Sequence, residues 1–263
     1  MNENSSEVAR SIGAMRFFYR WPLALWLAAA ATANAQAPGT ENPASAGTQK
    51  WAFSITPYLW AAGLDGDTGA DGVGAEIDTG YRFFSLDNLD FALALGVEAQ
   101  KGRWTALLDA MHVDFSDASE SSPIAVDAQV SGGFVETSAA YRAGRVAGLE
   151  LVVGARYVEL ESAVRLTPGP SAEADEGWLD PLVGARFTHA FNDRWSVTLR
   201  GDVGGFGVSS ELVTNVAAVF GCRLTDAATL RFGYRFLQMD YDDDGFVLDA
   251  IAQGYAFGVT FAL

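Results

Sequence analysis

The last nine residues, "YAFGVTFAL" from Tyr255 to Leu263, alternate bulky apolar side chains with small ones. The bulky residues are Tyr255, Phe257, Val259, Phe261 and Leu263. Successive side chains of a β-strand point to opposite faces, so this segment would have one apolar face and one face of small groups. A strand of a soluble sheet would carry charged residues on its solvent face. The pattern instead suits a closed membrane barrel, with bulky groups toward lipid and small groups inside.

The composition of the whole chain favours the same class of fold. The 263 residues include 28 glycines, and 12% of the chain is aromatic. Only two lysines occur, Lys50 and Lys101, against 15 arginines. A water-facing surface is rarely so poor in lysine. We therefore expect one large all-β domain that does not present an ordinary soluble surface.

Ten alternating segments with turn residues between them predict the strands of this barrel. They cover residues 51–64, 88–100, 103–116, 126–142, 148–166, 177–191, 194–207, 211–224, 228–241 and 246–263. Short turns such as "QKGR" and "FNDR" alternate with longer, more acidic connections, as in bacterial outer-membrane barrels. The predicted fold is a closed antiparallel up-and-down transmembrane β-barrel of ten strands, with eight or twelve strands as alternatives.

Aromatic residues gather near the two ends of these segments, which predicts one girdle at each lipid interface. The first set is Trp51, Trp104, Tyr141, Phe191, Trp195 and Phe261, and the second is Trp60, Phe115, Trp178, Phe206, Tyr241 and Phe246.

The N-terminal segment has the pattern of an export signal. Arg16 and Arg20 precede the apolar run "PLALWLAAAATA", which leads to the small residues "ANA" at 33–35. We expect a signal peptide over residues 1–35, with Met15 as the true start, a flexible linker over 36–49 and the barrel over 50–263. Removing residues 1–35 leaves 14 Lys+Arg and 31 Asp+Glu, a net charge of −17. Such a charge argues against nucleic acid as a partner.

Several pieces, including "WAFSITPYLWAAGLDG", "RWSVTLRGDVGGFG" and "LRFGYRFLQMDY", resemble a mostly uncharacterised, porin-like family of Gram-negative outer-membrane β-barrel proteins. The resemblance covers residues 51–263 and implies the fold and an outer-membrane location, without catalytic residues. It also implies that the alternating residues of the last strand are the signal for the barrel-assembly machinery. Members usually end in Phe, whereas this chain ends in Leu263.

The cost of placing an ionised group in lipid indicates which face of each strand points inward, because a charged side chain near the bilayer midplane costs up to about 4 kcal/mol. This rule turns Asp109 inward and Trp104 outward. Applied to every strand, it predicts an almost neutral network of charges inside the barrel. Its members are the acids Glu98, Asp109, Glu136, Asp180 and Asp202 and the bases Arg142, Arg156, Arg186, Arg200, Arg231 and Arg235. They either fill the interior as ion pairs or line an ion-selective constriction.

The remaining acids fall in the predicted outer loops, at Asp65, Asp67, Asp71, Glu76, Glu173, Asp175, Glu176 and Asp242–Asp244. Asp240, Asp242 and Asp244 before Gly245 resemble the first half of a calcium loop, but Ile251 occupies the twelfth position, where such a loop needs a carboxylate. The sequence thus predicts solvated acidic loops, with weak calcium binding as the alternative.

The function expected from these features is an envelope structural role or a narrow passive pore, with loop-mediated binding or adhesion as the alternative. A hydrolase is disfavoured, because the two histidines, His112 and His189, fall on the predicted outer face. We expect no enzyme and no cofactor. The expected partners are outer-membrane lipid, lipopolysaccharide and the barrel-assembly machinery, and the sequence leaves the oligomeric state open.

Overall fold

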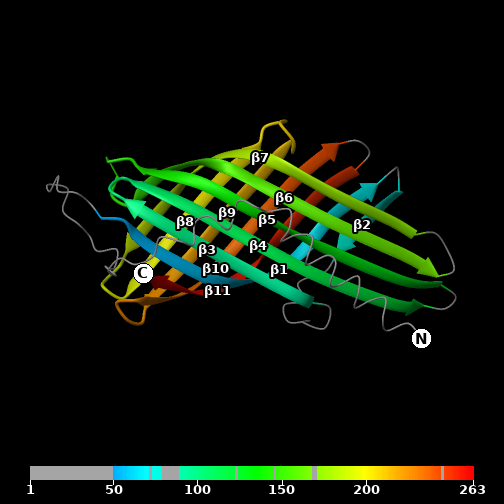
Figure 1. The fold of residues 1–263 in the computed structure, drawn as a ribbon, viewed down its shortest axis with the longest axis horizontal. Helices are drawn as coiled ribbons and strands as arrows, with labels where there is room; N and C mark the ends of the chain where they lie inside the picture. The colour runs from blue at the N-terminus through cyan, green and yellow to red at the C-terminus, as the bar shows by residue number, and fades with distance from the viewer. Residues whose placement is uncertain are drawn as a thin grey trace. The chain divides into compact units, whose positions relative to one another are not determined.

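One antiparallel sheet closes on itself in the computed structural model (Figure 1). The structure describes residues 50–70, 73–78, 89–121, 124–144, 146–167, 171–243 and 246–263. The expected signal peptide and linker lie outside these ranges. The strands are β1 (Ala52–Ala70), β2 (Val73–Asp78), β3 (Leu89–Lys101), β4 (Trp104–Ser121), β5 (Ile124–Arg142), β6 (Leu149–Thr167), β7 (Ser171–Ala190), β8 (Trp195–Gly205), β9 (Leu212–Arg223), β10 (Ala228–Asp243) and β11 (Phe246–Ala262).

Ten of these strands form the barrel wall, which confirms the predicted fold class and strand number. From β3 onward each strand pairs with the next, and β1 pairs with both β3 and β11 to close the ring. The closing β1–β11 ladder runs from Ser54↔Ala262 to Ala70↔Phe246. The short β2 pairs only with the far end of β1, over Asp65–Ala70, and extends the wall there. Among the described residues, no helix is long and apolar enough to cross a membrane.

Several strands continue well beyond their predicted ends, and their hairpins form tall extensions at one end of the barrel. The β4–β5 and β6–β7 hairpins, green and yellow-green at the right of Figure 1, reach furthest. We call this the tall-hairpin end, and the opposite end, with the turns 102–103, 191–194 and 224–227, the short-turn end. Outside lipid both strand faces can be polar, so the alternation that identifies a strand in the sequence disappears there.

This extension corrects the prediction that the surplus acids lie in loops. Asp65 and Asp67 belong to β1, Glu76 to β2, Glu173, Asp175 and Glu176 to β7, and Asp242 and Asp243 to β10. Asp71 and Asp244 lie outside the described residues. Much of the acidic charge at this end is therefore fixed on the sheet.

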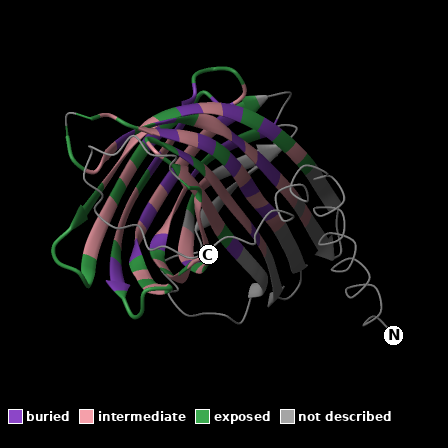
Figure 2. Ribbon diagram, turned by 60° about the vertical axis from the view of Figure 1, so that its left-hand side comes forward, coloured by how far each residue is buried: buried purple, intermediate pink, exposed green. Residues whose placement is uncertain are grey.

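Exposure alternates along the strands, as the bands of Figure 2 show. On β11, Tyr255, Phe257 and Phe261 are exposed, and Leu263 follows them, whereas Gly254 is buried. The first predicted girdle lies on this outer face near the short-turn end, where Trp51, Trp104, Phe191, Trp195 and Phe261 are all exposed. A continuous band of exposed apolar side chains is the surface that a membrane barrel presents to lipid.

The second predicted girdle is largely wrong, because most of its members point into the barrel. Trp60, Trp178, Tyr241 and Phe246 are buried in one cluster with Phe134, Val158, Val213, Leu237, Leu248 and Ala250. Only Phe206 of that set is exposed, and the side chain of Phe115 lies outside the described part. The position of a residue along its strand decides its depth in the membrane. Whether its number is odd or even, its parity, decides which face of the strand it lies on. Trp178 has the parity of the inward Asp180, and that signal was present in the sequence.

Candidate functional site

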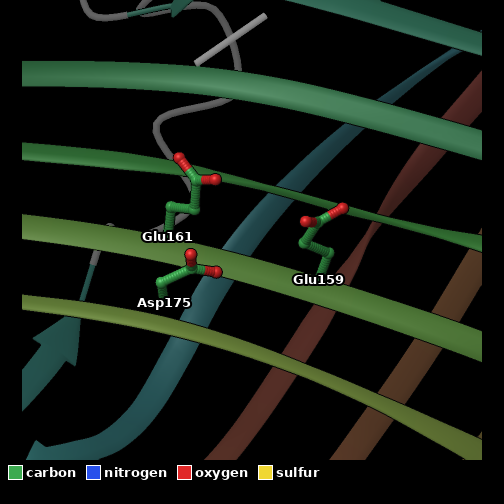
Figure 3. Close-up of side chains that lie close together, drawn as sticks. All are labelled: Glu159, Glu161 and Asp175. Atoms are coloured by element: carbon green, nitrogen blue, oxygen red, sulfur yellow. The ribbon is translucent and has the colours of Figure 1, made fainter. Parts of the chain in front are cut away.

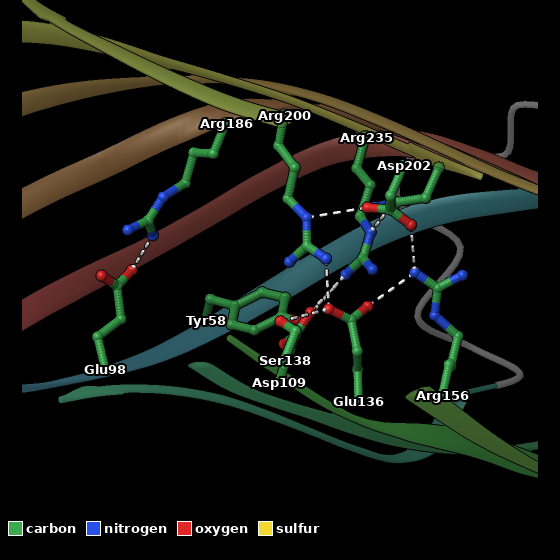
Figure 4. A network of polar contacts seen from close by, with 11 residues as sticks. Tyr58, Glu98, Asp109, Glu136, Ser138, Arg156, Arg186, Arg200, Asp202 and Arg235 are labelled. Carbon is green, nitrogen blue, oxygen red and sulfur yellow. Dashed lines mark hydrogen bonds and ion pairs between the residues drawn. The ribbon is translucent and has the colours of Figure 1, made fainter. Parts of the chain in front are cut away.

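A layer of charged side chains crosses the barrel interior between its two ends (Figure 4). Its centre is the pair Glu136 and Asp202, which share two arginines. Arg156 Nη2 donates to Glu136 Oε2 at 2.7 Å and to Asp202 Oδ1 at 2.9 Å. Arg200 donates through Nε to Asp202 Oδ2 at 2.9 Å and through Nη2 to Glu136 Oε1. The side chains of Glu136, Arg156 and Asp202 are each 1% exposed, so the two ion pairs of Arg156 are fully buried, whereas the Arg200 side chain is 15% exposed.

Arg235 extends this layer toward β1 and β4. Its Nη1 lies 3.0 Å from Asp109 Oδ2, and its Nε donates to Asn215 Oδ1 at 2.9 Å. Tyr58 donates to Asp109 Oδ1 at 2.7 Å. The Arg235 guanidinium also lies over the rings of Trp60, at 5.1 Å, and Phe134, at 4.8 Å. Arg235 therefore joins the charged layer to the apolar cluster, with cation–π contacts on one side and a carboxylate on the other.

The small residues of β11 make room for these large side chains. In the sheet register Gly254 lies beside Arg235, and Gly258 lies between Tyr58 and Arg231 on the neighbouring strands. A Cβ at Gly258 would come within 2.7 Å of Tyr58 Cβ. Because small barrels alternate large and small inward residues, the glycines of "QGYAFGVT" are the complement of the arginines opposite them.

A second ion network lies nearer the short-turn end. Arg186 Nη1 bonds Glu98 Oε1 at 2.9 Å, and its Nη2 lies 2.7 Å from Glu150 Oε2. Arg142 Nη2 is 3.9 Å from Glu150 Oε1. The Glu98 side chain is 45% exposed although it points inward, so water reaches this part of the interior.

Two residues of the predicted network have other partners than expected. Asp180 was expected to pair with an arginine, but it accepts from Trp178 Nε1 at 3.1 Å and from Ser210 N and Oγ at 2.8 and 2.6 Å. It therefore fixes the turn between β8 and β9. Arg231 is predicted as a base of the same network, but its Nε donates to a hydroxyl, Thr260 Oγ1, at 3.1 Å.

The sequence-based list also missed members of the network. Tyr58, Asn215 and Glu150 all contact the predicted charges. Glu150 has the parity of Arg156 on β6, and Tyr58 has the parity of Trp60 on β1. Glu150 is the second residue of its strand, where the sequence does not distinguish an acid of the turn from an inward-facing acid. It brings the predicted five acids and six bases to six of each.

The candidate calcium ligands Asp240 and Asp242 lie on one face of β10, and Asp244 lies outside the described residues. A calcium loop curls its ligands around the ion, whereas alternate strand residues are about 6.6 Å apart. Another acidic group lies on β6 and β7, where carboxylate oxygens of Glu159, Glu161 and Asp175 come within 4.8 Å of one another (Figure 3). Glu159 is buried, at 3% exposure, and Asp175 is exposed.

The two histidines differ in exposure. His112 has the parity of the exposed Trp104 on β4, but it is buried, at 3% exposure. His189 is exposed between Phe187 and Phe191, with ring centroids 6.3 and 5.2 Å away, so it belongs to the aromatic band at the short-turn end.

Comparison with known proteins identifies the fold. The outer membrane protease OmpT from Escherichia coli superposes with a TM-score of 0.54, over 84% of this chain and 100% of that chain, at 7% identity. Neisserial surface protein A and the Ail protein of Yersinia pestis match at 11% identity each, with TM-scores of 0.34 and 0.38, covering 80% and 81% of this chain and 96% and 97% of theirs. No protein-family model and no curated protein matches the sequence. The fold is that of outer-membrane β-barrel proteins.

Proposed function

We propose that this protein is a sealed outer-membrane barrel that serves the structure of the cell envelope and does not conduct. In this proposal the chain is exported by a signal peptide cleaved after Ala35, and both ends of the barrel chain lie in the periplasm. The tall-hairpin end then faces outward through the lipopolysaccharide. The exposed apolar band and the fold shared with OmpT support the location.

The observation that carries the proposal is the charged layer. Its side chains come from β1, β4, β5, β6, β8, β9 and β10, and so it reaches across the barrel. Each carboxylate at its centre accepts from two arginines, which leaves little capacity for a passing ion. Ion-paired charges of this kind act as a filling, because a buried ion is stable only with its partners in place.

The apolar cluster adds a second barrier toward the tall-hairpin end. Trp60, Phe134, Leu237 and Tyr241 are at most 8% exposed. An ion that crossed the charged layer would next meet these side chains without water, and hydrophobic constrictions block conduction in channels.

Hydrolysis is a weaker proposal, although OmpT is named as a protease. A hydrolytic site needs a nucleophile or an activated water beside a base. Both histidines have outward parity, and the buried carboxylates of the charged layer are engaged by arginines. We therefore propose no enzymatic activity.

Conductance across a planar bilayer tests the sealed interior. The refolded protein should give no stable channels, whereas Arg235→Ala should give small cation-preferring openings. The change removes a large side chain between Trp60 and Phe134 and leaves Asp109 without its arginine.

Arg142→Ala is the matched control, because Arg142 lies at the rim with its side chain 44% exposed. It should leave the bilayer as quiet as the unmodified protein does. Large channels in the unmodified protein, unchanged in size and ion preference by Arg235→Ala, would overturn the proposal in favour of an open diffusion pore.

A further inference from the structure

The barrel wall is low on one side at the tall-hairpin end. Strands β8 and β9 have 11 and 12 residues, whereas their outer neighbours β7 and β10 have 20 and 16. β7 pairs with β6 back to Ser171, but with β8 only from Leu182 onward. A notch in the wall therefore lies above the β8–β9 turn, between the free flanks of β7 and β10.

Pro181 is one reason why the β7–β8 ladder stops where it does. Thr188 N–H bonds Gly148 O on the β6 side, and Leu179 O accepts from Ser209 Oγ on the opposite side at 3.0 Å. Odd-numbered residues of β7 thus point their main-chain groups toward β8. Proline at position 181 has no N–H to donate there, and β8 itself ends at Gly205, so the ladder stops at the pair Leu182↔Gly204.

The same parity leaves Gly177 with its N–H and C=O directed into the notch. A hollow of about 470 Å³ opens beside it, lined by Gly177–Leu179 of β7, Gly207–Ser209 of the turn and Tyr241–Asp242 of β10. The rings of Trp178 and Tyr241 stack at 4.1 Å and are buried, so they separate the hollow from the barrel interior. The hollow therefore offers a strand edge and does not lead into the lumen.

The turn that forms the bottom of the notch is held in place. Ser210 bonds Asp180 through both N and Oγ, Ser209 bonds Leu179 O, and Glu211 N donates to Asp240 O at 2.8 Å. Gly207 takes a φ of 69°, which glycine adopts without strain. The notch is thus a built feature, fixed to both of its walls.

Its charge is of one sign. Asp242 lines the hollow, Glu176 and Glu211 lie in the chain segments that border it, and the segments 171–182, 206–213 and 238–243 contain no Lys or Arg. A ligand that pairs with a strand edge and fits this charge is an extended peptide carrying basic side chains. We infer that the notch binds such a peptide segment of another molecule, by addition of a strand to β7 beside Gly177.

Binding of synthetic decapeptides to the refolded barrel, measured by fluorescence anisotropy, tests this inference. Three probes are used: alternating Thr and Lys, alternating Thr and Glu, and the Lys peptide with alternate main-chain nitrogens methylated. The Lys peptide should bind and the Glu peptide should not. Methylation keeps the charge but blocks pairing along one edge, and should weaken binding at least about ten-fold.

Two variants of Gly177 place the site. Gly177→Pro removes the N–H that points into the notch and should lower affinity several-fold to about ten-fold. Gly177→Ala keeps that N–H but places a Cβ 2.6 Å from Tyr157 Oη, so the tyrosine ring has to shift, and this variant should lose less affinity than Gly177→Pro. Gel mobility before and after boiling checks that each barrel is folded. No binding of the Lys peptide, or equal binding of the methylated peptide, overturns the inference even if Gly177→Pro does not fold. Conductance plays no part in this test, so it stands or fails separately from the sealed interior.

Discussion

At the scale of single residues, the interior is governed by the need of buried charges for partners. Asp202 accepts from Arg156, Arg200 and Asn215, at 2.9, 2.9 and 2.7 Å. These donors come from three strands, so one carboxylate ties β6 and β9 to its own strand, β8. Removing one partner of such a group is costly, because the remaining charges stay buried without compensation.

Asp202→Ala should therefore lower the free energy of unfolding by about 3–5 kcal/mol. Urea titration of the protein in lipid vesicles measures it. Asp226→Ala, which removes an exposed carboxylate in the β9–β10 turn, should change the stability by less than about 0.5 kcal/mol. Similar losses in both variants would mean that the charged layer is solvated and not a filling.

At the scale of the element, β11 shows how one strand serves two environments. Phe257 and Phe261 are exposed on the outer face, at 49% and 41%. Thr260, next to Phe261 on the opposite face of the strand, hydrogen-bonds Thr56 Oγ1 at 2.9 Å and accepts from Arg231 Nε. The alternation therefore separates a lipid surface from a polar interior within a single strand.

Phe257→Asp or Phe261→Ala should reduce the amount of protein in the outer membrane far more than Thr260→Asn. A charge at Phe257 would face lipid, and loss of Phe261 would remove a residue of the expected assembly signal. Asparagine at position 260 keeps a polar group toward Arg231. Quantitative blots of membrane fractions compare the three variants, and equal losses would mean that the two faces of β11 contribute alike to insertion.

At the scale of the whole barrel, closure depends on the ladder between the first and last strands. β1 and β11 meet along almost their full lengths, and Gly254 lies within this ladder beside Ala62. A Cβ at Gly254 would overlap the carbonyl oxygen of Ala61, whereas a Cβ at Gly201 would have nothing within 4 Å. Alanine substitutions at the two positions therefore separate the effect of added bulk within the closing ladder from the general effect of replacing a glycine.

Gly254→Ala should reduce the fraction of protein that folds into a closed barrel, and Gly201→Ala should not. Closed barrels migrate differently on gels before and after boiling, so the fraction of the unheated band measures closure. A protein whose unheated and boiled samples migrate alike would not be a closed barrel. Equal fractions in the two variants would show that the β1–β11 ladder adjusts to an added methyl group.

The sequence by itself determined the fold class and the short-turn end, because lipid on one face and a crowded interior on the other impose a strict period of two. It favoured ten strands, and the tertiary structure excluded the alternatives of eight and twelve. It also listed most inward charges, since an ion in lipid is costly. The partners of those charges, such as Asp109 for Arg235 and Ser210 for Asp180, depended on the tertiary structure. Register and shear decide which strands meet across the lumen, and no local pattern encodes them. The notch above β8 and β9 also depends on the tertiary structure, because the free edge of β7 arises only when β7 is paired with the shorter strand β8.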